Sequence, residues 1–190
     1  MDFSQAAVDL LRVAHLFCFA AGMGTGVYFD FQTLIKLKQP LTEQYVQNLT
    51  NLHPWICSAF GGLWITGMAL IYVRTSFNIS EFPPKLWLKI ILMIFMIWNA
   101  HLINRFVIPT LKDNIGHPLI SIPAMKMFIV TQIGIFSMYC WTSGLLLGAS
   151  SVLKTANWEL LVPLSITWYI LLTVFGQLSL FLMCWRLSNR

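Results

Sequence analysis

The sequence predicts an all-α integral membrane protein, a bundle of five transmembrane helices, from its composition and from the length of its apolar segments. Of its 190 residues, 57% are hydrophobic and 10% are charged, whereas about 25% of the residues of a typical soluble domain are charged. A helix that crosses a bilayer needs about 20 mainly apolar residues. Because the connections are short, we expect one transmembrane domain over residues 1–190. Its spans are expected at residues 7–29, 55–73, 86–107, 127–147 and 160–185.

The first expected span, residues 7–29, carries a histidine inside an apolar segment. At 3.6 residues per turn, His15 shares one helix face with Gly22 and Gly26, and Arg12 lies about one turn before it. Glycines at this spacing let another helix or a flat ligand approach closely. A helix-packing face explains the same residues, and Arg12 is equally consistent with a contact to lipid headgroups.

The second expected span, residues 55–73, follows a polar segment in which leucines and a tyrosine recur at near-helical spacing. That segment is either an interfacial helix or an extension of the second span with Pro54 as a kink. His53 stands just before the span, and Gly61 and Gly62 leave room on its face. A histidine beside small residues again indicates a ligand position or a packing contact.

The third expected span, residues 86–107, is the richest in polar groups. Lys89 lies near its start, and His101 and Arg105 lie on one stripe near its end. Exposing an imidazole ring or a charged side chain to lipid costs free energy, so residues of this kind within a span usually face the protein interior and serve a function. The proline-containing segment that follows, residues 108–126, is expected to be a loop.

The last two expected spans, residues 127–147 and 160–185, contain few strongly polar side chains. Gly144 and Gly148 form a pair suited to helix packing. Several tryptophans lie near the span ends, as interfacial aromatics usually do. We therefore expect these spans to support the first three, where the polar chemistry is concentrated.

The distribution of lysine and arginine predicts the orientation of the chain. With five spans, the 30–52 loop, the 108–126 loop and the C-terminus share one side, and that side is the richer in basic residues. The positive-inside rule then makes the C-terminus cytoplasmic and places the N-terminus outside. The basic residues form no cluster of the kind that binds nucleic acid, so no nucleic-acid partner is expected.

Histidines in or beside three spans make haem b the first hypothesis for a cofactor, because such residues serve as axial ligands of haem iron in membrane bundles. His53 and His101 are expected at similar depth and would suit one haem. His15 is expected nearer the other surface, as a sole histidine ligand or as part of a second site. Three basic side chains are expected to neutralise propionates or substrate carboxylates: Arg12, Lys89 and Arg105.

The third span resembles the copper-resistance D (CopD) membrane domain. Lys89 is followed by an apolar run that closes with the segment NRFVIPTL, residues 104–111. The opening helix around His15 and the Thr66-Gly67 pair in the second span are similar to the same superfamily. The chain also resembles the HemJ-type protoporphyrinogen oxidases, with matching positions at His15, Pro54, Lys89 and His101.

The resemblance implies a small bacterial inner-membrane protein with haem b as its cofactor and with His15 and Lys89 as family positions. Such a protein would be an oxidoreductase in electron transfer, oxidising a porphyrinogen or quinol, although the sequence assigns no catalytic residue. Copper transport or tolerance is an alternative, and nine methionines offer soft ligands for Cu(I). A second alternative is a cofactor-free accessory subunit, or a homo-oligomer, that packs through its glycine-containing faces.

Overall fold

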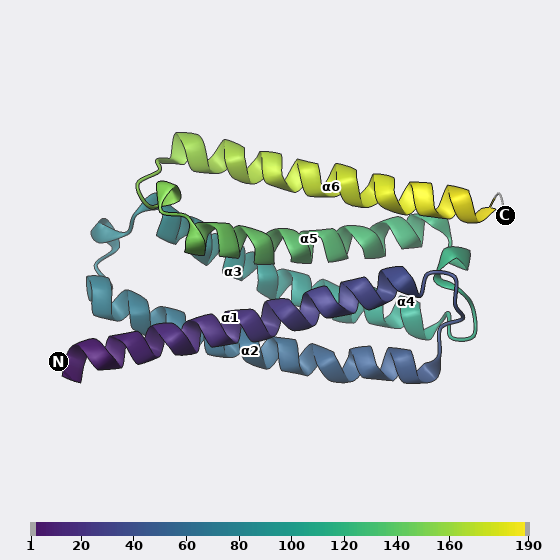
Figure 1. Ribbon diagram of the computed structural model, residues 1–190, viewed down its shortest axis with the longest axis horizontal. Coiled ribbons are helices and arrows are strands. Elements are labelled where there is room, and N and C mark those ends of the chain that lie inside the picture. Colours follow the sequence, from purple (N-terminus) through teal and green to yellow (C-terminus); the bar gives the residue numbers. More distant parts are fainter. Residues whose placement is uncertain (1–2, 189–190) are drawn as a thin grey trace. The chain divides into compact units, whose positions relative to one another are not determined.

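The computed structural model of the protein describes residues 3–188, which are helical apart from short connections (Figure 1). Five helices are long and apolar enough to cross a membrane, so the predicted all-α class with five spans is confirmed. These helices are α1 (Phe3–Ile35), α2 (Glu43–Thr75), α3 (Pro84–Leu102), α5 (Ala124–Ala149) and α6 (Trp158–Ser188). Short 3-10 turns at Ile79–Glu81, Leu119–Ser121 and Val152–Lys154 shape the connections.

The chain divides into two compact units, and the expected single domain over residues 1–190 stays a prediction. The first unit comprises the residues up to Phe31 together with Gln47–Phe82, and therefore most of α1 and α2. The second unit comprises Gln32–Val46 and the residues from Pro83 onward, and therefore α3, α5 and α6.

Helices α1 and α2 are longer than the sequence predicts. Each has 33 residues, which at a rise of 1.5 Å gives about 50 Å, against a hydrocarbon core of about 30 Å. Their ends therefore extend beyond the apolar part of a bilayer. Helix α2 runs without interruption from Glu43 through Pro54, so the polar segment before the second span is an extension of that span. The alternative of a separate interfacial helix is wrong.

The third span also continues further than predicted. After α3 the backbone makes a π-helical turn at Ile103–Val107 and then a short helix, α4 (Ile108–Lys112). The N–H of Ile108 bonds to the carbonyl O of Ile103, five residues earlier. Pro109 has no N–H and its ring clashes with the carbonyl four residues before it in a regular helix. The wider π turn relieves this clash, and the chain stays helical into the segment expected to be a loop.

Two loops pack together at one end of the second unit. The N–H of Leu41 donates to the His117 carbonyl O at 3.0 Å, and the N–H of Gly116 donates to the Leu41 carbonyl O at 2.8 Å. Gly116 adopts a φ of 86° at this contact. These loops and the adjoining α4 carry several buried leucine and isoleucine side chains: Leu37, Leu41, Leu111, Leu119 and Ile122. The loop after α1 and the loop after α4 therefore share one end of this unit, as expected when consecutive spans run in opposite directions.

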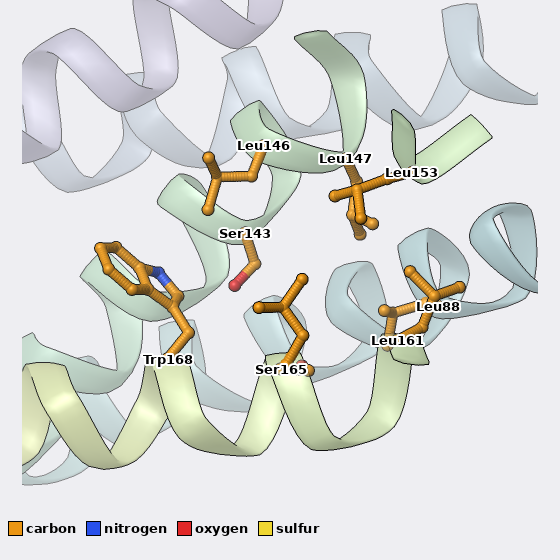
Figure 2. Close-up of a pocket in the computed structure, with 9 residues that line it drawn as sticks. Leu88, Ser143, Leu146, Leu147, Leu153, Leu161, Ser165 and Trp168 are labelled. Carbon is orange, nitrogen blue, oxygen red and sulfur yellow. The ribbon is translucent and has the colours of Figure 1, made fainter. Parts of the chain in front are cut away.

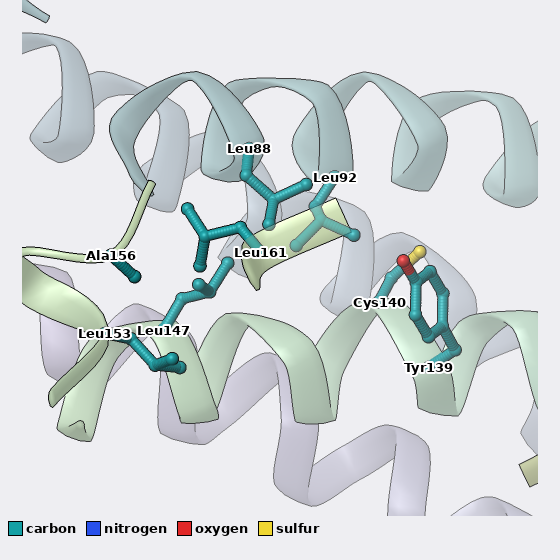
Figure 3. Close-up of a cluster of buried hydrophobic side chains, with 8 residues drawn as sticks. All are labelled: Leu88, Leu92, Tyr139, Cys140, Leu147, Leu153, Ala156 and Leu161. Atoms are coloured by element: carbon teal, nitrogen blue, oxygen red, sulfur yellow. The ribbon is translucent and has the colours of Figure 1, made fainter. Parts of the chain in front are cut away.

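The opposite end of the second unit holds a small cavity of about 30 Å³ (Figure 2) and, beside it, an apolar core (Figure 3). The Nζ of Lys85, in the first turn of α3, donates to the Ser150 carbonyl O at 2.9 Å and ties α3 to the end of α5. Helices α3, α5 and α6 and the connection between α5 and α6 contribute the buried side chains of the core: Leu88, Leu92, Tyr139, Cys140, Leu147, Leu153, Ala156 and Leu161.

The Gly116 turn gives a first test. A methyl group added at Gly116, or at Gly134 in the middle of α5, would meet no other atom within 4 Å, so both positions have room for an alanine side chain. The two glycines differ in backbone conformation, because only Gly116 has a positive φ. We expect Gly116→Ala to lower the free energy of unfolding by about 1–2 kcal/mol. We expect the control Gly134→Ala to be neutral or to raise it by about 0.5–1 kcal/mol.

Unfolding of both variants in the same detergent measures this difference. Equal stability of the two variants would contradict the role assigned to the Gly116 turn.

Candidate functional site

The six predicted site residues fall equally into the two units. The first unit contains Arg12, His15 and His53, and the second contains Lys89, His101 and Arg105.

His15 on α1 makes a hydrogen bond to α2. Its Nδ1 lies 2.9 Å from the Oγ1 of Thr66. The same hydroxyl donates to the carbonyl O of Gly62, one turn earlier on α2, at 2.7 Å, and a hydroxyl has only one proton to donate. When the Thr66 proton is directed to Gly62, Nδ1 of His15 is the donor of this contact. In a neutral imidazole the lone pair then lies on Nε2, the nitrogen that metal-binding histidines commonly use.

Two glycines of α2 provide room for side chains of α1. A Cβ at Gly67 would lie 3.3 Å from Cε1 of His15, so the imidazole ring sits close against the α2 backbone. A Cβ at Gly62 would lie 2.7 Å from Sγ of Cys18. At Gly61, in contrast, a Cβ would meet nothing within 4 Å. Glycine thus permits the close approach of α1 and α2 at Gly62 and Gly67.

His53 lies far from this contact. It is buried, with 7% of its surface exposed, and its Nε2 lies 3.6 Å from Sγ of Cys57, one turn further along α2. Thirteen residues separate His53 from Thr66, which corresponds to about 20 Å along the helix. His15 and His53 therefore cannot bind the same iron while α1 and α2 pack in this way.

Arg12 forms an ion pair on its own helix. Its Nη1 lies 2.7 Å from Oδ1 of Asp9, one turn earlier, and about half of each side chain is exposed. An exposed pair of this kind contributes about 0–1 kcal/mol, so its guanidinium can change partners at little cost. The predicted contact between Arg12 and a propionate stays a prediction.

In the second unit, His101 and Arg105 are exposed, whereas Lys89 is half-buried. The π turn lies directly after α3 and includes Arg105, whose guanidinium carbon is 6.0 Å from the centre of the Phe106 ring. Lys89 and His101 are twelve residues apart on α3, or about 18 Å along its axis. The stripe expected near the end of this span, with His101 and Arg105, is therefore exposed. Lys89 lies well apart from it along the helix.

Sequence reasoning missed a polar network between α5 and α6. The Nε2 of Gln132 lies 2.7 Å from the Tyr169 hydroxyl and 3.3 Å from Oγ1 of Thr173. The Nε2 of Gln177 donates to Oε1 of Gln132 at 3.1 Å. The expectation of little polar chemistry in these two spans is thus corrected. A usable signal was present, because Tyr169, Thr173 and Gln177 recur every four residues and so share one helix face.

A scan against protein-family models finds no match to the chain, and searches of the curated proteins and of the solved structures find none either. The resemblance to the CopD and HemJ-type proteins therefore stays a prediction. Within residues 3–188, no group of three or more His, Cys, Asp or Glu side chains converges on a position for a metal ion.

The contact between His15 and Thr66 can be measured by a double-mutant cycle that combines Thr66→Val with His15→Phe. Hydrogen bonds between membrane helices contribute about 0.6 kcal/mol on average, and we expect a coupling free energy of that size. Thr66→Ser should retain it, because the serine hydroxyl keeps the acceptor.

Thr75→Val is the matched control, because the Thr75 hydroxyl donates to the Ile71 carbonyl O of its own helix. Reversible unfolding in detergent gives the four free energies of each cycle. The control cycle combines Thr75→Val with His15→Phe. If the coupling free energy between His15 and Thr66 equals the one between His15 and Thr75, the assigned hydrogen bond is ruled out.

Proposed function

We propose that this multi-pass membrane protein binds haem b and passes electrons between a membrane donor, a quinol or a porphyrinogen, and an acceptor. The observation that carries the proposal is the hydrogen bond by which Thr66 holds His15 inside the first unit. A bound haem would supply one-electron transfer at its iron. His15 would hold the iron, and the contact on α2 would keep its ring in place.

The residues around His15 suit this role. Histidines that bind metals usually donate their other ring N–H to an acceptor, which fixes the tautomer and the direction of the ring. Thr66 serves as such an acceptor when its own proton is directed to Gly62, and Gly67 lets the ring sit against the helix. Arg12 lies one turn from His15 and would exchange Asp9 for a propionate. In this arrangement the protein positions the ligand before a cofactor arrives.

The remaining predicted ligands have weaker support. His53 is too far from His15 to share an iron with it and already contacts Cys57. His101, Arg105 and Lys89 keep their assignments on the sequence argument alone. The bacterial inner membrane, with the N-terminus outside and the C-terminus in the cytoplasm, is likewise proposed from the resemblance and the distribution of basic residues.

Two alternatives each have an observation in their favour. Copper transport or tolerance is favoured by the approach of Cys57 Sγ to His53 Nε2, at 3.6 Å, because thiolate and imidazole both bind copper. An accessory subunit or a homo-oligomer is favoured by the exposure of Trp98, His101 and Arg105, because polar side chains within a span usually face protein. Haem b is preferred because the contact with Thr66 fixes the direction of the His15 ring.

An optical spectrum of the detergent-purified protein tests the proposal. We expect a Soret band and, after reduction with dithionite, a sharp α-band of the b type. His15→Ala should abolish or shift these bands, and Thr66→Val should weaken haem binding by about 10–100-fold. His117→Ala is the control, because His117 is exposed in a loop, and its spectrum should be unchanged.

Other outcomes identify the alternatives. Copper in the purified protein without a Soret band, lost in Cys57→Ser, would replace the proposal with copper handling. A protein without metal or haem that co-purifies with other membrane subunits would support the accessory role. Haem bands that are unaffected by His15→Ala would overturn the ligand assignment.

A further inference from the structure

The cavity at one end of the second unit contains two hydroxyl groups among apolar side chains (Figure 2). Its volume is about 30 Å³. Leucines from α3, α5 and α6 form most of its wall, and Ser143 of α5 and Ser165 of α6 supply its hydroxyls. Leu146 and Leu164 line it as well and are partly exposed, so the cavity lies near the surface of the unit.

Ser143 is the polar group that needs an explanation. Only 6% of its surface is exposed, and its Oγ has no hydrogen-bond partner among residues 3–188. Figure 2 shows this oxygen directed away from the α5 backbone and toward α6. A buried hydroxyl that has lost its contact with water and gained no other partner destabilises a protein, and most such groups in native structures are satisfied.

The Tyr139 hydroxyl lies near Ser143, but no hydrogen bond of regular geometry joins the two. Tyr139, one turn earlier on α5, has its hydroxyl hydrogen-bonded to Oγ of Ser165. The indole N–H of Trp168 donates to Oγ1 of Thr142 at 2.9 Å. Tyr139 and Ser165 together have two hydroxyl protons, and their mutual bond uses one of them. Ser143 and the Tyr139–Ser165 pair therefore retain hydrogen-bonding capacity beside the cavity.

We propose that this cavity is a binding site for a single water molecule that bridges Ser143 and Ser165. A buried water needs a volume of at least about 10–15 Å³ and two to four polar partners. The cavity exceeds that volume and its wall offers two hydroxyls. The water completes the hydrogen bonding of Ser143 and adds a polar contact between α5 and α6 beside the direct hydrogen bond between Tyr139 and Ser165.

Substitution of Ser143 distinguishes a hydrated cavity from a dry one by the sign of its effect. If water is bound, Ser143→Ala removes one of its partners and lowers the midpoint of thermal unfolding in detergent. If the cavity is dry, the same change removes an unsatisfied hydroxyl and leaves the midpoint unchanged or raised, which would overturn the proposal. Ser58→Ala is the control, because the exposed Ser58 hydroxyl donates to the Pro54 carbonyl O of its own helix, and its midpoint should change little.

Density for the unaltered protein provides a second measurement that needs no variant. At a resolution that reveals ordered waters, we expect one peak within hydrogen-bonding distance of both Ser143 Oγ and Ser165 Oγ. An empty cavity, or binding of xenon there under pressure, would show that the site is dry and would overturn the proposal. Both measurements are independent of haem binding at His15, so their outcome does not depend on the proposed function.

Discussion

Polar side chains inside a bilayer need partners within the protein, and this constraint explains the specific contacts between the helices. In the first unit, the imidazole of His15 meets the hydroxyl of Thr66 across the α1–α2 contact. In the second unit, Gln132 bonds to side chains of α6, and Tyr139 pairs with Ser165. Apolar packing alone would leave the rotation of each helix weakly defined, because lipid and leucine are equally apolar. The polar contacts specify which faces meet.

The contact at His15 differs in kind from the network between α5 and α6. Gln132 bonds to amide and hydroxyl groups of α6. A structural connection between the two helices fully explains these bonds. At His15, Nδ1 meets a hydroxyl whose own proton is directed to Gly62, and this arrangement favours the tautomer with the proton on Nδ1. That arrangement is typical of a ligand held ready for a metal. It makes His15 the residue on which the functional proposal depends.

The number and class of the helices were predictable from the sequence, because long apolar runs have few alternatives. Their ends were less predictable. The polar residues before Pro54 left the extension of α2 as one of two alternatives, and a π turn before Pro109 prolonged the third span beyond its expected end. At the candidate site, His15 was recognisable as a polar residue in an apolar segment. The role of Thr66 was not, because a threonine in a membrane helix usually bonds to its own backbone and its partner lies 51 positions away.

The tautomer of His15 is the central claim, and nitrogen NMR of the protein in lipid bilayers or micelles tests it most directly. With ¹⁵N-labelled histidine, and with His15→Gln to assign the signals, the shifts of the two ring nitrogens reveal which one carries the proton. Before any haem is added, the arrangement with Thr66 predicts a protonated Nδ1 and an unprotonated Nε2. A proton on Nε2 with the lone pair on Nδ1, or rapid exchange between the two forms, would contradict it.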